Sequence, residues 1–255
     1  MIGMDLGSRT VKIIQMSGEK LIAAEIYDSI DFYRRFGKEG HGSLRIDLND
    51  LGFETRDRLV ATGFGKITVQ VKGAVHIPEI QAHVKGAVFQ TGLSDFTLLD
   101  IGGQEIRVVR VERCRAVDQM SNDQCAASSG RYLENMAEVL HMSLEEISQY
   151  EENPVELVST CAIFGESEII NKIVDGYDSQ RLAAGINYSL YRRCAGMLES
   201  MKADTIVLSG GVSKNLALAR IIERESGQKV IALQHGQLNG AIGCCVYGRQ
   251  IFELA

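Results

Sequence analysis

Met1-Ile2-Gly3-Met4-Asp5-Leu6-Gly7-Ser8 reads as an apolar strand that ends in an aspartate and a glycine turn. Residues 96–103, Phe-Thr-Leu-Leu-Asp-Ile-Gly-Gly, repeat this outline. After each copy come two further strand-like segments, at 10–16 and 20–26 and again at 105–111 and 115–120. This start is antiparallel, whereas a Rossmann unit places a helix directly after its first strand. The sequence therefore predicts two related lobes that begin with the same strand meander.

The rest of the chain alternates between helical and strand-like patterns, which predicts an α/β fold with mixed sheets flanked by helices. We expect strands at 59–62, 205–208 and 230–233, and helices at 79–89, 126–140, 161–174, 182–201, 216–225 and 239–252. Ser143-Leu144-Glu145-Glu146 fits a capping box at the start of a short helix. We expect an N-terminal lobe at 1–90 and a C-terminal lobe at 91–255, with a last helix that can pack back on the N-terminal lobe.

The composition is that of a globular protein that works in solution. The chain has 255 residues, 45% hydrophobic and 24% charged, with a net charge of -6. That charge gives no electrostatic reason to expect nucleic acid or an anionic membrane as a partner. There is no apolar run of about 20 residues and no basic, apolar leader, so we expect a cytoplasmic location. The six cysteines form no CxxC pair, which argues against a zinc site.

Asp5 and Asp100 are each predicted at a strand end beside glycines, which is an arrangement that suits phosphate binding. Glycine lets backbone N–H groups come close to phosphate oxygens. An aspartate beside such a turn can hold Mg²⁺, usually through water. Lys12 is close enough in sequence to reach a terminal phosphate. Strand-Asp-Gly is also ordinary turn chemistry, so neither turn alone identifies a site.

Ser209-Gly210-Gly211, before a predicted helix, adds a third glycine turn. The order of the three turns resembles the actin, hexokinase and heat-shock-chaperone superfamily, which has a two-lobed, ribonuclease H-like fold. There, two acids approach the phosphates and Mg²⁺ from two lobes, and the late turn covers the adenosine. The chain has no GxxxxGK[ST] motif, which argues against a P-loop. The predicted ATP contacts are Gly7, Ser8, Arg9, Thr10, Lys12, Gly102, Gly103, Gly210, Gly211 and Asn215.

Cys125 and Cys161 each directly precede a predicted helix. The unpaired N–H groups and the dipole of a helix N-terminus lower the pKa of a cysteine there, which favours a thiolate. Spacing alone leaves the alternative that these are buried, inert thiols. For the other cysteines the buried, inert interpretation is preferred: Cys114, Cys194, Cys244 and Cys245.

Several segments, in order along nearly the whole chain, resemble one family more closely. They are Ala61-Thr62-Gly63-Phe64-Gly65, Glu79-Ile80 with His83, Lys85, Gly86 and Ala87, Asp100 to Gln104, Asn122 to Ala127 with Gly130-Arg131, and Cys161 to Phe164 with Glu166 and Glu168. This is the BadF/BadG/BcrA/BcrD ATPase family, which includes activators of 2-hydroxyacyl-CoA dehydratases. The two cysteine segments are the most specific part of the resemblance.

The resemblance implies an ATP-driven electron donor. Family members hold one [4Fe–4S] cluster between two subunits, each giving two cysteines, here Cys125 and Cys161. It further implies a homodimer, a reduced ferredoxin or flavodoxin as donor, and an iron–sulfur enzyme as acceptor. That acceptor would be a 2-hydroxyacyl-CoA dehydratase, a benzoyl-CoA reductase or a double-cubane cluster protein. A [4Fe–4S] cluster normally takes four thiolates, which a two-fold dimer supplies as two plus two.

The candidate catalytic residues are Asp5, Asp100, Gln104 and Glu166, with Asp5 and Asp100 also expected at Mg²⁺. Glu166, like Glu168, is a candidate for positioning the hydrolytic water, although a helical acid is often only solvated. Two alternatives stay open. One is a small-molecule kinase of the same fold without a cluster, and the other is a nucleotide-sensing scaffold without turnover.

Overall fold

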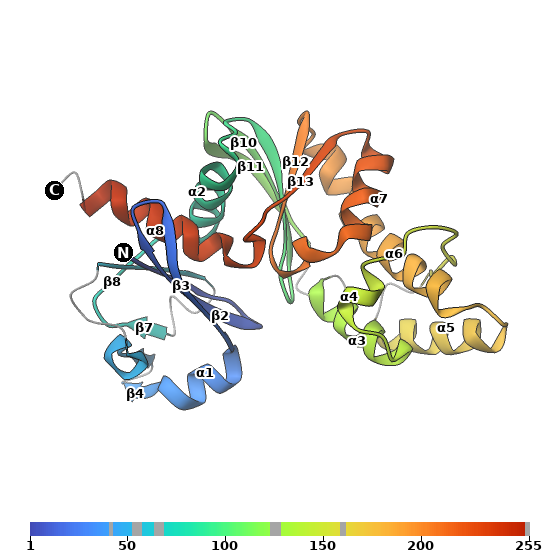
Figure 1. The fold of residues 1–255 in the computed structure, drawn as a ribbon, viewed down its shortest axis with the longest axis horizontal. Helices are drawn as coiled ribbons and strands as arrows, with labels where there is room; N and C mark the ends of the chain where they lie inside the picture. The colour runs from blue at the N-terminus through green and yellow to red at the C-terminus, as the bar shows by residue number, and fades with distance from the viewer. Residues whose placement is uncertain (41–42, 53–57, 64–68, 123–128, 159–161, 253–255) are drawn as a thin grey trace. The chain divides into compact units, whose positions relative to one another are not determined.

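The computed structural model describes residues 1–40, 43–52, 58–63, 69–122, 129–158 and 162–252 (Figure 1). The chain forms two compact units. The first unit comprises Met1–Ser94, Cys114–Ala116 and Gln237–Ala255, and the second unit comprises Asp95–Arg113 and Val117–Gly236.

The first unit is built on a five-stranded mixed sheet. Its strands, in the spatial order β3-β2-β1-β6-β8, are β3 (Lys20–Asp28), β2 (Thr10–Ser17), β1 (Ile2–Leu6), β6 (Leu59–Gly63) and β8 (Ala74–His76). β1 pairs antiparallel with β2 and parallel with β6. Every residue of β1 and of β6 is buried, as expected for central strands that are covered on both faces.

Side-chain alternation along β1 separates two cores. Ile2, Met4 and Leu6 pack with α1 (Ser29–Phe36) and with the strand residues Ile46, Val69 and Val71. These last residues belong to a small sheet of β4 (Lys38–Gly40), β5 (Ser43–Ile46) and β7 (Val69–Val71). The 3₁₀ helix η1 (Leu48–Leu51) lies between β5 and β7 in the sequence. Neither α1 nor the small sheet was predicted. The intervening residues of β1, Gly3 and Asp5, therefore face the other side of the sheet.

On that other side lie α2 (Glu79–Thr91) and α8 (Asn239–Phe252), which run next to each other in Figure 1. Glycines let these elements pack backbone to backbone. A Cβ on Gly3 would lie 2.1 Å from the carbonyl oxygen of Ala241, and one on Gly243 would lie 1.7 Å from that of Ala82. A larger residue at Gly3 would move α8 away from the sheet, and one at Gly243 would move α8 away from α2.

The second unit repeats the sheet of the first. Its order is β11-β10-β9-β12-β13, made of β11 (Arg115–Ser121), β10 (Ile106–Glu112), β9 (Phe96–Ile101), β12 (Thr205–Ser209) and β13 (Lys229–Ala232). β9 pairs antiparallel with β10 and parallel with β12, and β12 pairs parallel with β13. Because the order and the strand directions match those of the first unit, the prediction of two copies of one pattern is confirmed.

Among the described residues of the second unit, the α-helices are α3 (Gly130–Leu140), α4 (Leu144–Ile147), α5 (Ala162–Val174), α6 (Ser179–Ser200) and α7 (Leu216–Ser226). Leu99 and Ile101 of β9 pack in one core with Tyr132 of α3 and Ile186 of α6. Asp100 alternates with them and faces away from this core.

The predicted capping box at the start of α4 is confirmed. Ser143 Oγ accepts from the N–H of Glu146 at 3.1 Å, and Glu146 Oε2 accepts from the N–H of Ser143 at 2.6 Å. These hydrogen bonds also lower the pKa of the Glu146 carboxyl.

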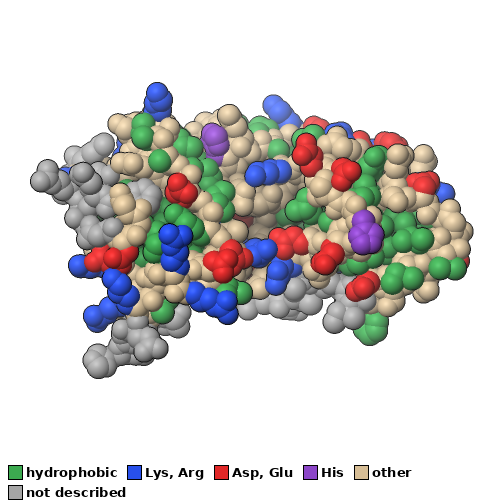
Figure 2. Space-filling model, turned by 60° about the horizontal axis from the view of Figure 1, so that its bottom comes forward, with side chains coloured by type: hydrophobic (Ala, Val, Ile, Leu, Met, Phe, Trp, Pro, Cys, Tyr) green, Lys and Arg blue, Asp and Glu red, His purple; other side chains and the backbone are tan. Residues whose placement is uncertain are grey.

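Among the residues described, no helix is both long and apolar enough to cross a bilayer. Acidic and basic side chains are interspersed on the face drawn in Figure 2.

Candidate functional site

Asp5, at the end of β1, is a buried carboxylate with a lysine directly across the strand pair. Its side chain is on the face that α2 and α8 cover, and the residue is only 3% exposed. Lys12 is its register partner on β2, and Lys12 Nζ donates to Asp5 Oδ2 over 3.1 Å. Within the described part of the chain, Asp5 Oδ1 has no hydrogen-bond partner. One oxygen of this buried carboxylate is therefore left for a ligand.

The turn after β1 contains several of the residues predicted to contact ATP, and they have different surroundings. A Cβ on Gly7 would lie 2.7 Å from the carbonyl oxygen of Thr10 and 2.8 Å from Lys12 Nζ, so only glycine allows this close approach. Ser8 is exposed. Arg9 pairs with Asp28, the residue that caps α1, so its guanidinium has a structural role.

Glu79 and His83 of α2 also reach Asp5, and the prediction of site residues missed them. They are four residues apart and so lie on one face of the helix. One ligand atom from each of Asp5, Glu79 and His83 lies within 4.8 Å of the other two. The sequence signal was an acid and a histidine at helical spacing, but only tertiary packing turns this face toward Asp5.

In the second unit, Asp100 stands opposite Ser209 of β12 and opposite Arg107 of β10. Asp100 is 8% exposed, and the turn that follows it is closed by a hydrogen bond of 2.9 Å from the N–H of Gly102 to the carbonyl of Glu105. Gln104 is exposed on this turn. Asp100 thus lies near the end of β9, and the Gly102-Gly103 turn follows it, as predicted from the strand-Asp-Gly pattern.

The start of α3 is hydrogen-bonded to the Gly102-Gly103 turn. The N–H of Gly130 donates to the carbonyl of Gly102 at 2.9 Å, and the N–H of Arg131 donates to the carbonyl of Gly103 at 3.0 Å. Ser129 Oγ donates to the same Gly103 carbonyl at 2.6 Å. The first N–H groups of a helix have no partner within the helix, and here the turn provides one. A displacement of the turn is therefore passed to the first residues of α3.

The third predicted turn touches the second. Gly210 has φ +83, and a Cβ there would lie 2.2 Å from the carbonyl oxygen of Ile101, at the end of β9. In the first unit, Gly63 at the end of β6 has φ +111 and would place a Cβ 2.4 Å from the carbonyl oxygen of Leu6. The two units therefore use the same glycine at the same place. Gly211 is exposed and has no atoms within 4 Å of a built Cβ.

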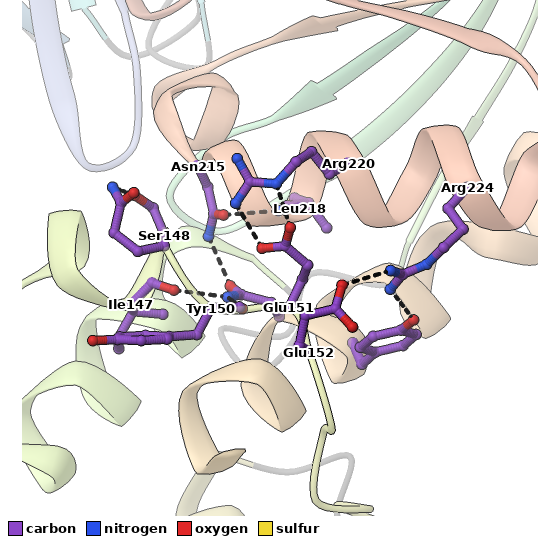
Figure 3. A network of polar contacts seen from close by, with 12 residues as sticks. Ile147, Ser148, Tyr150, Glu151, Glu152, Asn215, Leu218, Arg220 and Arg224 are labelled. Carbon is purple, nitrogen blue, oxygen red and sulfur yellow. Dashed lines mark hydrogen bonds and ion pairs between the residues drawn. The ribbon is translucent and has the colours of Figure 1, made fainter. Parts of the chain in front are cut away.

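Asn215, predicted at the nucleotide, is used by the protein itself (Figure 3). Its Oδ1 accepts from the N–H of Leu218 at 2.9 Å and caps α7, and its Nδ2 donates to Asn187 Oδ1 at 2.8 Å. The Nδ2 of Asn187, a fully buried residue of α6, donates to the carbonyls of Ile147 and Tyr150, both at 2.9 Å. Asn215 thus joins α7 to α6 and α4, and a contact with nucleotide stays a prediction.

The two cysteines predicted at the cluster, Cys125 and Cys161, lie outside the described residues. Three other cysteines are buried, and burial raises the pKa of the Cys194 and Cys245 thiols to about 12 and raises that of Cys244 as well. The expectation of burial is wrong for the remaining cysteine.

That cysteine is Cys114, which is exposed at the turn between β10 and β11 with φ 62. Its neighbours Arg113 and Arg115 are exposed too, so the hairpin tip lies in solvent.

Glu166, predicted to position the hydrolytic water, is exposed on α5.

Two sheets of the same order, each with an Asp-Gly turn and a left-handed glycine after the neighbouring parallel strand, define a protein of the actin and hexokinase fold. A ROK family glucokinase from Streptomyces griseus, solved with glucose and AMPPNP, has this fold with a TM-score of 0.61 at 12% identity. The match covers 98% of this chain and 99% of the glucokinase chain.

The chain belongs to the BadF/BadG/BcrA/BcrD ATPase family, whose model matches residues 2–248. It is 31% identical to the activator of lactoyl-CoA dehydratase of Anaerotignum propionicum over 258 residues, 96% of each protein. It is also 29% identical to the (R)-2-hydroxyglutaryl-CoA dehydratase activating ATPase of Acidaminococcus fermentans over 253 residues, 96% of this chain and 95% of that protein. A solved structure, the activator of 2-hydroxyisocaproyl-CoA dehydratase from Clostridium difficile with bound ADPNP, matches with a TM-score of 0.83 and 26% identity, and the match covers 100% of this chain and 97% of that one.

Proposed function

We propose that this protein hydrolyses ATP to drive single, low-potential electrons from an iron–sulfur cluster onto a partner enzyme. Membership in an ATPase family supports the first half of the proposal. The names of two relatives support the existence of a partner enzyme, because both are activators of dehydratases. A further relative, a component of the benzoyl-CoA reductase of Thauera aromatica, is 30% identical over 264 residues, 96% of this chain and 92% of that protein.

Both units carry candidate ATP contacts. In the first unit, Lys12 supplies a cation and Gly7 gives close access to its backbone. In the second unit, Asp100 and the Gly102-Gly103 turn are candidate phosphate contacts, and Gly210 and Gly211 are candidates for the adenosine. Ser8, Thr10 and Gln104 remain candidate contacts, and Glu166 remains a candidate for holding the attacking water.

A magnesium ion fits the chemistry of these residues. Asp5 and Asp100 offer oxygen atoms, the ligands that Mg²⁺ prefers, and Mg²⁺ keeps several of its waters. The unpartnered Oδ1 of buried Asp5 is the observation that supports this fit. When bound, the ion neutralises charge that develops on the phosphates during hydrolysis.

The observation that carries the proposal is the attachment of α3 to the Gly102-Gly103 turn. Three hydrogen bonds join that turn to Ser129, Gly130 and Arg131. Cys125 precedes Ser129 by only four residues in the sequence. A change at the phosphate turn on hydrolysis therefore has a short covalent route to this cysteine, which is what coupling between ATP and a cluster requires.

The cysteine chemistry also favours Cys125 and Cys161 as the cluster ligands. A [4Fe–4S] cluster takes about four thiolates, so a two-fold dimer supplies two per chain. The thiols of Cys194, Cys244 and Cys245 keep their protons because burial raises their pKa values. When bound, the cluster supplies one-electron redox chemistry. The four described cysteines are free thiols, which fits the reducing cytoplasm.

Exposed apolar side chains on α5 support the homodimer. Phe164 is 70% exposed and Val174 is 81% exposed, and Ile170 and Ile173 are each about half exposed. Cys161 directly precedes this helix. Large apolar groups on one exposed helix are typical of a surface that is covered in an assembly, and a shared cluster requires the second subunit close to Cys161. A reduced ferredoxin or flavodoxin as donor and an iron–sulfur enzyme as acceptor complete the proposal.

The test is anaerobic purification followed by iron, sulfide and EPR analysis with and without nucleotide. We expect about four irons and about four sulfides per dimer, and ATP hydrolysis by the reduced protein. Cys125→Ser and Cys161→Ser should each abolish the cluster, whereas the exposed control Cys114→Ser should retain it. An iron-free dimer that is indifferent to oxygen would contradict the proposal, and phosphorylation of a sugar or acyl substrate by that protein would identify a kinase instead.

A further inference from the structure

Three potential metal ligands converge on the covered face of the first sheet. Asp5 comes from the end of β1, and Glu79 and His83 come from the first two turns of α2. Their ligand atoms all lie within 4.8 Å of one another, and Asp5 and His83 are 3% and 8% exposed. All three residues belong to the first unit, so the cluster does not depend on the second unit or on a bound nucleotide.

The distances suit a single ion after a small adjustment. Carboxylate oxygens and imidazole nitrogens bind divalent first-row metals at about 2.0–2.2 Å, so two ligands on opposite sides of one ion are about 4–4.4 Å apart. Glu79 is the first residue of α2 and is only half-buried, so its side chain has room to move toward Asp5 and His83 when an ion binds.

A second observation points independently to a cation. Asp5 Oδ1 is buried and has no hydrogen-bond partner among the described residues, although Oδ2 has Lys12. A buried carboxylate oxygen without a partner is costly, and a bound cation removes that cost. With one lysine against two carboxylates, the local charge stays negative, so Lys12 does not exclude a divalent cation.

Gly240 keeps a side chain from crowding Asp5 and His83. A Cβ on Gly240, at the start of α8, would lie 2.9 Å from His83 Nε2 and 3.0 Å from Asp5 Oδ2. Glycine at this position lets α8 pack tightly on the sheet without a side chain between the two donors.

We propose that Asp5, Glu79 and His83 hold a divalent transition-metal ion in the absence of nucleotide. The imidazole decides the class of metal, because Mg²⁺ prefers oxygen ligands, whereas nitrogen donors favour first-row transition metals such as Mn²⁺, Fe²⁺, Co²⁺ and Zn²⁺. This site shares Asp5 with the nucleotide-bound Mg²⁺ proposed above, and it differs in that the protein alone supplies its fixed ligands. The ion lies beside the Gly7 turn, where a cation can contact bound phosphates.

The test uses Mn²⁺ because cysteine thiolates do not favour it, so cluster ligands and free thiols do not compete for the probe. The full chain is stripped with a chelator, exchanged into buffer without nucleotide and titrated with Mn²⁺, and EPR measures the free aqueous ion. We expect one Mn²⁺ per chain, retained in the presence of equimolar Mg²⁺. Loss of one ligand in Glu79→Gln or His83→Gln should weaken binding by about tenfold or more.

Matched controls are Glu25→Gln on β3 and His76→Gln on β8, two exposed residues of the same unit, which should bind Mn²⁺ like the unaltered protein. Because His83 is buried, circular dichroism must show that its variant is folded; Glu79→Gln changes a half-buried residue by one atom and keeps the proposal testable. Absence of Mn²⁺ binding without nucleotide, equal affinity in Glu79→Gln, or displacement by equimolar Mg²⁺ would each overturn the assignment. None of these results would affect the cluster analysis that tests the ATPase proposal.

Discussion

Replacing Gly210 by alanine tests how tightly the end of β12 is pressed against the end of β9. Gly210 has φ +83, a backbone conformation that side chains other than glycine rarely adopt. The added Cβ would lie 2.2 Å from the oxygen, 2.6 Å from the carbon and 3.0 Å from the nitrogen of Ile101. These are backbone atoms of a buried central strand, so no side-chain rotation can relieve the overlap.

The magnitude follows from two costs. A left-handed backbone costs a non-glycine residue about 1–2 kcal/mol. Forcing an extra carbon into a packed site costs about 1–3 kcal/mol. We therefore expect Gly210→Ala to lower the free energy of unfolding by about 2–5 kcal/mol. In a chain of this size 1 kcal/mol changes Tm by about 2–4 °C, so Tm should fall by about 4–20 °C.

The neighbouring glycine provides the control. A Cβ on Gly211 would meet no atom within 4 Å, so Gly211→Ala should stay within about 0.5 kcal/mol of the unaltered protein. Thermal unfolding of both variants, followed by circular dichroism, compares them directly. Equal Tm values for the two variants would refute the reasoning, because the clash at Ile101 would then have no energetic consequence.

Two further predictions concern the second unit. Asn215→Ala removes the cap of α7, worth about 1 kcal/mol, and leaves Asn187 Oδ1 without its donor, which costs about 1–3 kcal/mol. Urea unfolding should therefore show a loss of about 2–4 kcal/mol, and Asn215→Ser should lose less because serine still caps. Burial raises the pKa of Cys194 from 9.0 to about 12, so folding favours the protonated thiol. Its contribution is complete below pH 9 and is lost as the pH rises toward 12, at up to about 1.4 kcal/mol per pH unit, a slope that should become shallower in Cys194→Ala.

A specific result would contradict each of these two predictions. If Asn215→Ala and Asn215→Ser unfold at the same urea concentration, the cap contributes nothing measurable to α7. If the stability of Cys194→Ala falls as steeply above pH 9 as that of the unaltered protein, another group controls the alkaline loss.

The strand meanders and their acidic turns were predictable because their information is local. Asp5 and Asp100 each end an apolar strand, and the alternating pattern of the next strands fixes their register. The same holds for the capping box at Ser143 and Glu146, where the side chains and the backbone they bind are three residues apart.

The missed elements depend on signals that the sequence lacks. No glycine or proline separates β3 from α1; instead, Asp28 both ends the strand and caps the helix, accepting from the N–H groups of Ile30 and Asp31. The turn at Arg113 and Cys114 was predicted from the strands on both sides of it, although both residues have positive φ, a conformation usually signalled by asparagine or glycine.

The candidate metal ligands were missed for a different reason. The helix that carries Glu79 and His83 was predicted, but its orientation depends on the close packing of α2 against α8 and of α8 against β1. That packing rests on glycines such as Gly243, more than 150 residues further along the chain. No local pattern connects residues this far apart. The hydrogen bond from Asn215 to Asn187 was not predictable either, because the two residues are far apart in the sequence.

The packing of α8 on β1 and β6 also has a consequence during synthesis on the ribosome. The second unit ends at Gly236, whereas the first unit is completed only by residues from Gln237 onward. A nascent chain therefore finishes its second unit while Ile14 and Met16, which pack against α8, still lack their cover. The first unit is therefore the first to be synthesised and the last to be completed. If synthesis stops before Asn239, the chain lacks α8, and the apolar side chains that α8 covers are exposed to chaperones or to aggregation.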